Sequence, residues 1–266
     1  MYLLFDIGGT KLRLALAPDL ASFGEPRVLP TPTSFPDALA VMREFVGNNK
    51  IEGIAGGIAG TWDEGRTKLL ASPHLPGWVG ASIKAELAQA FNCPVYLEND
   101  AAIVGLGEAQ DRPEKIIAYL TISTGVGGAR LVNGKIDAHG VGFEPGQAIL
   151  DYHHPEKHFE DYVSGTAVKL ATGQEPKTIT DPAFWIELSK IVAIGLHDLA
   201  LEWTPDTIVI GGSMMGTPGL NLEVIKQEFA LRWEAHTPLP TITRATLGDL
   251  GGLHGALAFL KQNLDK

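Results

Sequence analysis

Cysteine is almost absent from this chain. The sequence of 266 residues contains one cysteine, Cys93. A single thiol cannot close an internal disulfide, and a structural zinc site built from thiolates needs several of them. The composition therefore excludes a disulfide-stapled fold and fits a reducing compartment.

Basic residues and long apolar runs are also scarce. The chain has 21 lysines and arginines against 31 acidic residues, which gives a formal net charge of −10. Nucleic acids and anionic membrane surfaces attract a positive field, so we expect neither as a partner. The amino-terminal apolar run is interrupted at Asp6 and has no basic leader. We therefore expect a cytoplasmic protein without signal peptide or membrane-spanning helix that acts on small molecules.

Glycine, in contrast, is abundant and unevenly distributed. The 31 glycines cluster directly after apolar runs typical of strands. Five such junctions occur, at 6–10, 53–60, 123–128, 211–213 and 248–252. Because glycine has no side chain, backbone amides at these turns can approach a ligand and converge on an anion. The repeated junctions predict one shared site for a polyanion.

Two of the junctions resemble each other. Residues 4–14 and 121–131 each read as an apolar strand, a glycine turn and a second alternating strand, which predicts a β-hairpin. A dinucleotide-binding turn would open a helix instead, and no Gly-x4-Gly-Lys-Ser/Thr phosphate loop occurs. The near-duplication predicts two similar α/β lobes with a nucleotide held between them.

The remaining pattern alternates strands and helices. Apolar periodicity predicts helices at 36–46, 82–91 (with Ser82 as N-cap), 101–110, 159–171, 182–203, 220–235 and 252–262. Further strands are predicted at 51–58, 94–97, 116–122, 207–210 and 241–246. The segment 111–114 has the composition of a lobe junction. We predict a small lobe over 1–110, completed by the C-terminal helix 252–266, and a large lobe over 111–251.

Eight short segments occur in the order found in one protein family. They are DIGGTK at 6–11, GIAGTWD at 57–63, LPGW at 75–78, ENDA at 98–101, STGVGG at 123–128, FEPGQ at 143–147, EDYVSG at 160–165 and IGGS at 210–213. These residues resemble the ROK (repressor, open reading frame, kinase) family of sugar kinases, within the actin, hexokinase and Hsp70 group. The resemblance implies a two-lobed, ribonuclease H-like α/β fold with nucleotide and sugar in the interlobe cleft. It also allows a homodimer.

The activity implied by the resemblance is ATP-dependent phosphorylation of a sugar hydroxyl. Such transfer depends on positioning and on charge neutralisation. The phosphate-binding residues would be Gly8, Gly9, Thr10, Lys11, Thr124, Gly125, Gly127 and Gly128, with Gly211 and Gly212 on the adenosine side. The ammonium of Lys11 faces either the phosphates or solvent. Asp6, at the end of a buried strand, suits Mg²⁺ held through water, and its alternative role is to cap the turn.

Asp100 is the predicted catalytic base, which accepts the proton of the attacking hydroxyl. Its alternative is an ordinary helix N-cap, since it precedes an apolar helical run. The resemblance adds Asn99, Gly60, Glu144 and Glu160 as substrate-binding residues, because amides and carboxylates suit polyols. The most favoured substrate is the 6-hydroxyl of a hexose, as in a glucokinase. N-acetylglucosamine, N-acetylmannosamine and fructose are the alternatives.

The chain departs from the family at one motif. The motif histidine that contacts sugar and ligates zinc in many members is Gln147 here, and the cysteine-rich zinc loop is missing. An amide still binds a hydroxyl but is a poor zinc ligand, so we predict substrate binding by Gln147 and no structural zinc. The alternative is a metal held by His153, His154 and His158 with Asp151; we favour a solvated loop there.

Two other histidines have weaker signals. His139 reads as a loop residue, and His74, before LPGW, is a candidate substrate contact.

Two rival functions also remain. A sugar-responsive repressor would need a helix-turn-helix before the first hairpin, for which the sequence leaves no room. A sugar-binding protein that has lost catalysis would be compatible with Gln147, although the intact Asp6 and Asp100 argue against it.

Overall fold

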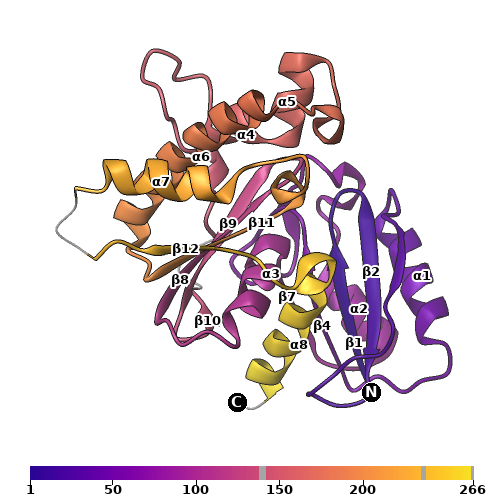
Figure 1. The fold of residues 1–266 in the computed structure, drawn as a ribbon. Coiled ribbons are helices and arrows are strands. Elements are labelled where there is room, and N and C mark those ends of the chain that lie inside the picture. The colour runs from indigo at the N-terminus through magenta and orange to yellow at the C-terminus, as the bar shows by residue number, and fades with distance from the viewer. Residues whose placement is uncertain (138–141, 235–237, 265–266) are drawn as a thin grey trace. The chain divides into compact units, whose positions relative to one another are not determined.

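The computed structural model describes residues 1–137, 142–234 and 238–264 (Figure 1). The chain forms two compact units. Unit 1 contains Met1–Gln110 and the carboxy-terminal segment from Asp249 onward, and unit 2 contains Asp111–Asp137 and Phe143–Gly248. Within the described residues, no helix is long and apolar enough to cross a membrane.

Unit 1 is built on a five-stranded sheet in the order β3-β2-β1-β4-β7. The strands are β1 (Tyr2–Ile7), β2 (Lys11–Ala17), β3 (Arg27–Pro30), β4 (Gly53–Ile58) and β7 (Val95–Asn99). The first three are antiparallel neighbours, whereas β1, β4 and β7 are parallel. The register places Asp6 opposite Gly57 and Gly57 opposite Glu98. Three separate motifs thus meet where the parallel strands end, the edge at which open α/β sheets bind ligands.

Helices and a small hairpin complete unit 1. The helices are α1 (Phe35–Val46), α2 (Ile83–Phe91), α3 (Asp100–Ala109) and α8 (Gly251–Leu264), and the hairpin joins β5 (Thr61–Trp62) to β6 (Leu69–Ala71). A core that includes Phe5, Phe35 and Trp78 forms one buried cluster. Elsewhere α8 packs against α3, β4 and β1 (Figure 1).

Unit 2 repeats the sheet plan of unit 1. Its order is β10-β9-β8-β11-β12, with β8 (Ile116–Ile122), β9 (Val126–Val132), β10 (Lys135–Ile136), β11 (Thr207–Gly211) and β12 (Thr241–Arg244). An antiparallel hairpin, β8–β9, is again followed by parallel neighbours. The helices are α4 (Phe159–Val163), α5 (Gly165–Thr172), α6 (Pro182–Trp203) and α7 (Leu222–Arg232). The buried core of unit 2 contains apolar residues of α6 and of β8.

The predicted hairpins and most predicted helices are confirmed, with three corrections. The helix expected at 159–171 is two helices, because Ser164 adopts an extended conformation and caps α5 through the amide of Ala167. Ser82 stands at the N-cap position of α2, but its side chain makes no capping hydrogen bond. Strand β12 ends at Arg244, so the glycines at 248–252 follow a loop instead of a strand.

The contact between α3 and α8 requires glycine. A Cβ atom at Gly255 would lie 1.7 Å from the carbonyl oxygen of Ile103, far inside van der Waals contact. We expect Gly255→Ala to force the helices apart and to lower the free energy of unfolding by about 2–3 kcal/mol. Urea denaturation measures this. The control is Gly24→Ala, where the nearest atom would be 3.5 Å away; similar stability of the two variants would contradict the helix-contact explanation.

Candidate active site

The first glycine turn, Gly8–Thr10, connects β1 to β2 in unit 1. Its carbonyl groups are bound from one side by Thr31: the Thr31 hydroxyl donates to Gly8 O (2.7 Å), and the Thr31 amide donates to Thr10 O (3.1 Å). The Gly8 amide closes the turn by donating to Lys11 O. Among the described residues, the amides of Gly9 and Thr10 have no such partner. They are therefore available to an external acceptor such as a phosphate oxygen.

Asp6 lies at the end of β1 in a cluster of charged side chains. It is 8% exposed, and its Oδ2 accepts a hydrogen bond from Arg13 at 2.9 Å. Arg13 and Lys11 also lie 3.5 and 3.7 Å from the exposed carboxylate of Asp249. Burial raises the pKa of Asp6 above its ordinary value, and Arg13 opposes that shift. The ammonium of Lys11, expected to face either the phosphates or solvent, lies beside the carboxylate of Asp249.

His74 packs directly on the first glycine turn. A Cβ atom at Gly9 would lie 2.5 Å from His74 Cβ, so only glycine fits beneath this side chain. His74 itself is exposed. The structure thus brings His74, a weak candidate in the sequence, next to the predicted phosphate-binding turn.

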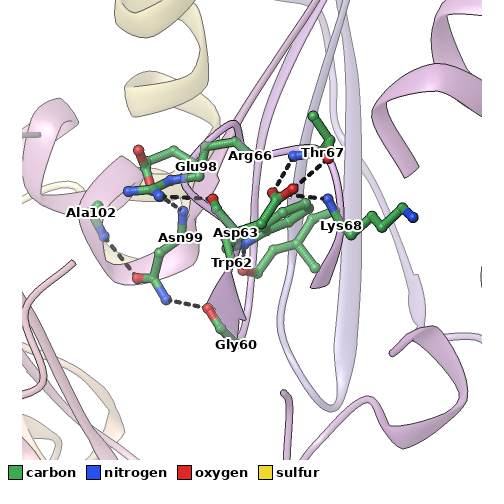
Figure 2. A network of polar contacts seen from close by, with 10 residues as sticks. Gly60, Trp62, Asp63, Arg66, Thr67, Lys68, Glu98, Asn99 and Ala102 are labelled. Carbon is green, nitrogen blue, oxygen red and sulfur yellow. Dashed lines mark hydrogen bonds and ion pairs between the residues drawn. The ribbon is translucent and has the colours of Figure 1, made fainter. Parts of the chain in front are cut away.

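The amino end of α3 carries Asn99 and Asp100 (Figure 2). Asn99 is the N-cap: its Oδ1 accepts from the amide of Ala102 (3.2 Å), and its Nδ2 donates to Gly60 O (3.1 Å). Asp100 therefore does not cap the helix, and its alternative role as an N-cap is wrong. Its backbone packs on β4, since a Cβ at Gly57 would lie 2.9 Å from Asp100 Cα. The predicted sugar-side residues Gly60, Asn99 and Asp100 are thus gathered in unit 1.

The second glycine turn, Ser123–Gly125, connects β8 to β9 in unit 2. Its carbonyls are bound by the first amides of α5: Gly165 N donates to Ser123 O (2.6 Å), and Thr166 N donates to Thr124 O (3.2 Å). The Ser123 hydroxyl accepts from the amide of Ser213 at 3.0 Å. As in unit 1, the carbonyls of a glycine turn are tied down from one side. Among the described residues, the amide of Thr124 has no hydrogen-bond partner, so it is available to a ligand.

A pocket of about 760 Å³ opens beside this turn, entirely within unit 2. Its size falls in the range of cofactor sites. Apolar walls come from Leu170, Pro176, Trp185 and Met214, and polar groups come from Ser123, Thr124 and Lys177. Such a mixture suits a flat heterocycle attached to a phosphorylated sugar. The predicted adenosine-side residue Gly212 precedes Ser213 of the lining, and its φ of 96° favours glycine.

Two carboxylates and an amide lie close to the end of the same turn. Glu160 accepts from the amide of Val126 (3.2 Å) and from Gln147 Nε2 (2.6 Å). Its Oε2 would lie 2.9 Å from a Cβ at Gly125, so glycine is needed for this approach. Partial burial and the negative charge of Glu160 raise the pKa of Glu144. The predicted sugar-binding residues Glu144, Gln147 and Glu160 are therefore brought together.

Several of the glycines predicted to bind the nucleotide lie where the surrounding structure favours glycine. Gly127 and Gly128 lie within β9, opposite Thr121 and Leu120. A Cβ at Gly128 would lie 2.8 Å from Pro145 Cγ, and one at Gly211 would lie 2.8 Å from the Tyr119 hydroxyl. These positions shape the hairpin and the strand end. Phosphate binding by Gly127 and Gly128, and adenosine binding by Gly211, remain predictions.

The histidines of the 151–158 loop lie beside different carboxylates and do not converge on one metal position. His154 Nδ1 lies 3.4 Å from Glu156, whereas His158 Nδ1 lies 3.5 Å from Asp161. His158 immediately precedes α4, so the two rings do not share a helix face. The described residues contain no group of three or more histidine, cysteine, aspartate or glutamate side chains arranged to hold a metal. His139 lies outside the described residues.

The sequence did not reveal Thr31 as a residue of the candidate site, nor the contact between Ser123 and Ser213. Thr31 follows β3, more than twenty positions beyond the turn that it holds. Ser123 and Ser213 belong to recognised motifs, but only the fold shows that the Ser213 amide donates to the Ser123 hydroxyl. Threonine and serine are too common in loops for these contacts to be read from sequence.

Two sheets of the same order, each opened by a glycine hairpin, define the actin-like ATPase class of fold, and the fold class is confirmed. The sequence profile of the ROK family matches residues 2–263, so the chain belongs to that family. An N-acetyl-D-glucosamine kinase of Yersinia pseudotuberculosis is 29% identical over 98% of both chains.

Solved structures of other family members have the same fold. A ROK hexokinase from Thermus thermophilus aligns with a TM-score of 0.83 and 25% identity over 99% of both chains. A glucokinase from Streptomyces griseus, solved with glucose and AMPPNP, aligns with a TM-score of 0.80 and 23% identity. That alignment covers 98% of this chain and 99% of the glucokinase.

The raised pKa of Glu144 has a consequence for stability. A carboxyl whose pKa is raised by folding costs stability when it is ionised, so the penalty is present at neutral pH and disappears as the pH falls below the ordinary glutamate value. We expect Glu144→Gln to raise the unfolding temperature of the ligand-free protein slightly at pH 7 and to have no such effect near pH 4. Calorimetry at the two pH values measures this, with exposed Glu25→Gln as the control. A lowered unfolding temperature of Glu144→Gln at pH 7 would contradict the expectation.

Proposed function

We propose that the protein is an ATP-dependent sugar kinase. One observation carries the proposal: within unit 2, the Ser123–Gly125 turn lines a nucleotide-sized pocket and is also contacted by Glu160, one of the predicted sugar-binding residues. Ser123 and Thr124 line the pocket, while Glu160 reaches Gly125 and Val126. Adjacent residues of one turn would thus serve the phosphate donor and the hydroxyl acceptor, as phosphoryl transfer requires.

Each unit would contribute different groups to the reaction. The amides of Gly9, Thr10 and Thr124 would bind phosphate oxygens in place of water. Asp100, at the first position of α3, would accept the proton of the attacking hydroxyl. Asn99 already uses its amide within the protein, but each amide atom can make a second hydrogen bond to a sugar hydroxyl.

The residues around Asp6 fit a magnesium ion bound through water. A carboxylate that keeps one oxygen on Arg13 still has its other oxygen for a metal-bound water, and Asp249 lies nearby as a second hard ligand. When bound, Mg²⁺ would neutralise phosphate charge. Arg13 and Lys11 would keep the carboxylates of Asp6 and Asp249 in place.

The favoured acceptor is the 6-hydroxyl of a hexose, and an N-acetylhexosamine is the main alternative because of the likeness to an N-acetyl-D-glucosamine kinase. ADP release measured over glucose, mannose, fructose, allose, N-acetylglucosamine and N-acetylmannosamine distinguishes them. Activity with any of them supports a kinase. Binding of sugars without turnover of any would favour a protein that has lost catalysis.

Asp100→Asn tests the assignment of the base. The amide preserves the shape of the side chain but cannot take the proton, so we expect kcat to fall by about a hundredfold or more. Sugar affinity should stay within a few-fold, because the amide still hydrogen-bonds a hydroxyl. Steady-state kinetics and calorimetric sugar titration measure the two effects, and near-normal turnover would remove Asp100 from this role.

Gln147→Ala tests the sugar side of unit 2. Its loss removes the amide that donates to Glu160, so we expect the apparent KM for sugar to rise by about tenfold, the effect of one lost hydrogen bond to a charged group. The KM for ATP should be unchanged. A change confined to the KM for ATP would show that Gln147 serves the nucleotide instead.

A further inference from the structure

Arg66 has an unusual backbone conformation and a largely buried side chain, and the proposed reaction does not use it. It lies in the turn between β5 and β6 with a φ of 52°, a left-handed conformation that is disfavoured for a long side chain. Its side chain is nevertheless only 12% exposed. Such a backbone conformation persists where surrounding contacts determine it strongly. The contacts of Arg66 therefore indicate what the turn is built to hold.

The turn itself is organised by Asp63 (Figure 2). The Asp63 carboxylate accepts from the amide of Thr67 (2.6 Å), from the amide of Lys68 (3.1 Å) and from the Thr67 hydroxyl. Arg66 adds a hydrogen bond from its guanidinium to the Asp63 carbonyl at 3.2 Å. These bonds fix the direction in which the Arg66 side chain leaves the turn.

The Arg66 side chain ends on the last residues of β7. Its Nε donates to Glu98 Oε1 at 2.7 Å, and the Glu98 side chain is 8% exposed. The same Oε1 accepts from the amide of Asn99 at 2.8 Å. A buried carboxylate needs such partners, because an unpaired charge is costly away from water. One oxygen atom thus joins the β5–β6 turn to the peptide at which α3 starts.

A second contact connects the same hairpin to Asn99. Gly60, immediately before β5, accepts from Asn99 Nδ2, and Asn99 Oδ1 caps α3 at Ala102. Figure 2 shows Gly60 and Arg66 reaching Asn99 and Glu98 from the two ends of the hairpin. Both the side chain and the amide of Asn99 are therefore held, and Asp100 is the next residue.

We propose that Arg66 is a positioning residue for the Asn99–Asp100 pair. By its ion pair with Glu98, it sets the course of the chain from β7 into α3 and hence the location of the Asp100 carboxylate. The inference rests on the proposed function, in which Asp100 is the base. Small displacements of a catalytic group of about 1 Å cost on the order of a hundredfold in rate. Lysine cannot replace Arg66, because a single ammonium does not reproduce the planar guanidinium that serves Glu98 and the Asp63 carbonyl together.

Three variants test this inference. Arg66→Met removes the guanidinium, and Arg66→Lys keeps the charge. The double variant Arg66→Met with Glu98→Gln also removes the unpaired negative charge, and leaves the Asn99 amide only a neutral acceptor that Arg66 no longer holds in place. The matched control is Arg27→Met in the same unit, because Arg27 makes an exposed ion pair with Glu44 at 3.3 Å.

We expect kcat to fall by about 10–100-fold in the double variant, and to a similar extent in Arg66→Lys, with the KM for ATP unchanged. The control should keep its activity within about twofold. The double variant guards against loss of folding in Arg66→Met. Its unfolding temperature should be close to that of the unmodified protein, so that reduced turnover reports position and not instability. Wild-type kcat in the double variant would overturn the inference.

Hydrogen exchange provides a readout that needs no catalysis. We expect the amides of Asn99 and Ala102 to exchange faster in the double variant than in the unmodified protein or in Arg27→Met, while amides of β1 are unaffected. Unchanged exchange at both positions would also overturn the inference. If the unmodified protein phosphorylates no sugar, the proposed function fails, and the exchange rates still decide whether Arg66 holds the start of α3.

Discussion

The carbonyl groups of both glycine turns are tied down from one side, and the candidate site depends on this constraint. In unit 1, Thr31 binds the carbonyls of Gly8 and Thr10. In unit 2, the first amides of α5 bind those of Ser123 and Thr124. A peptide whose carbonyl is fixed presents its amide on the opposite face, and several such amides together attract an anion. The two units reach the same result by different means: the hydroxyl and the amide of a single threonine in one, and the start of a helix in the other.

The strand order turns these local constraints into a site. Because β1, β4 and β7 are parallel and in register, Asp6, Gly57 and Glu98 lie side by side although they come from distant parts of the sequence. Glycine at the middle position allows the backbone of Asp100 to pack closely. The acid at the third position is neutralised by Arg66. An unpaired charge buried near this edge would lower the stability of the fold. Each of the two buried carboxylates there, Asp6 and Glu98, is accordingly paired with an arginine.

The sequence was informative wherever a local pattern determined the structure. Strand, glycine turn and alternating strand predicted both hairpins, and α6 was predicted at its observed bounds because its apolar period is long and uninterrupted. The break at Ser164 was missed because the apolar pattern of a helix continues on both sides of the Ser164-Gly165 pair, and the bond from the Ala167 amide to the Ser164 hydroxyl shows the new start. Thr31 and Arg66 could not be foreseen, and His74 was only a weak candidate, since each acts on a residue more than twenty positions away that only the folded chain brings near.

Gln147 changes how the sugar-side carboxylates respond to pH. Glu160 is oriented by two neutral donors, the Gln147 amide and the Val126 backbone, and neither changes charge between pH 5 and 8. A histidine at position 147 would titrate in that range and would alter the field at both glutamates. With the amide in place, the carboxyl whose pKa is raised is that of Glu144, because it is partly buried and lies near the negative charge of Glu160. The pH response of this acidic group therefore rests on the carboxyl of Glu144 and not on the residue that donates to Glu160.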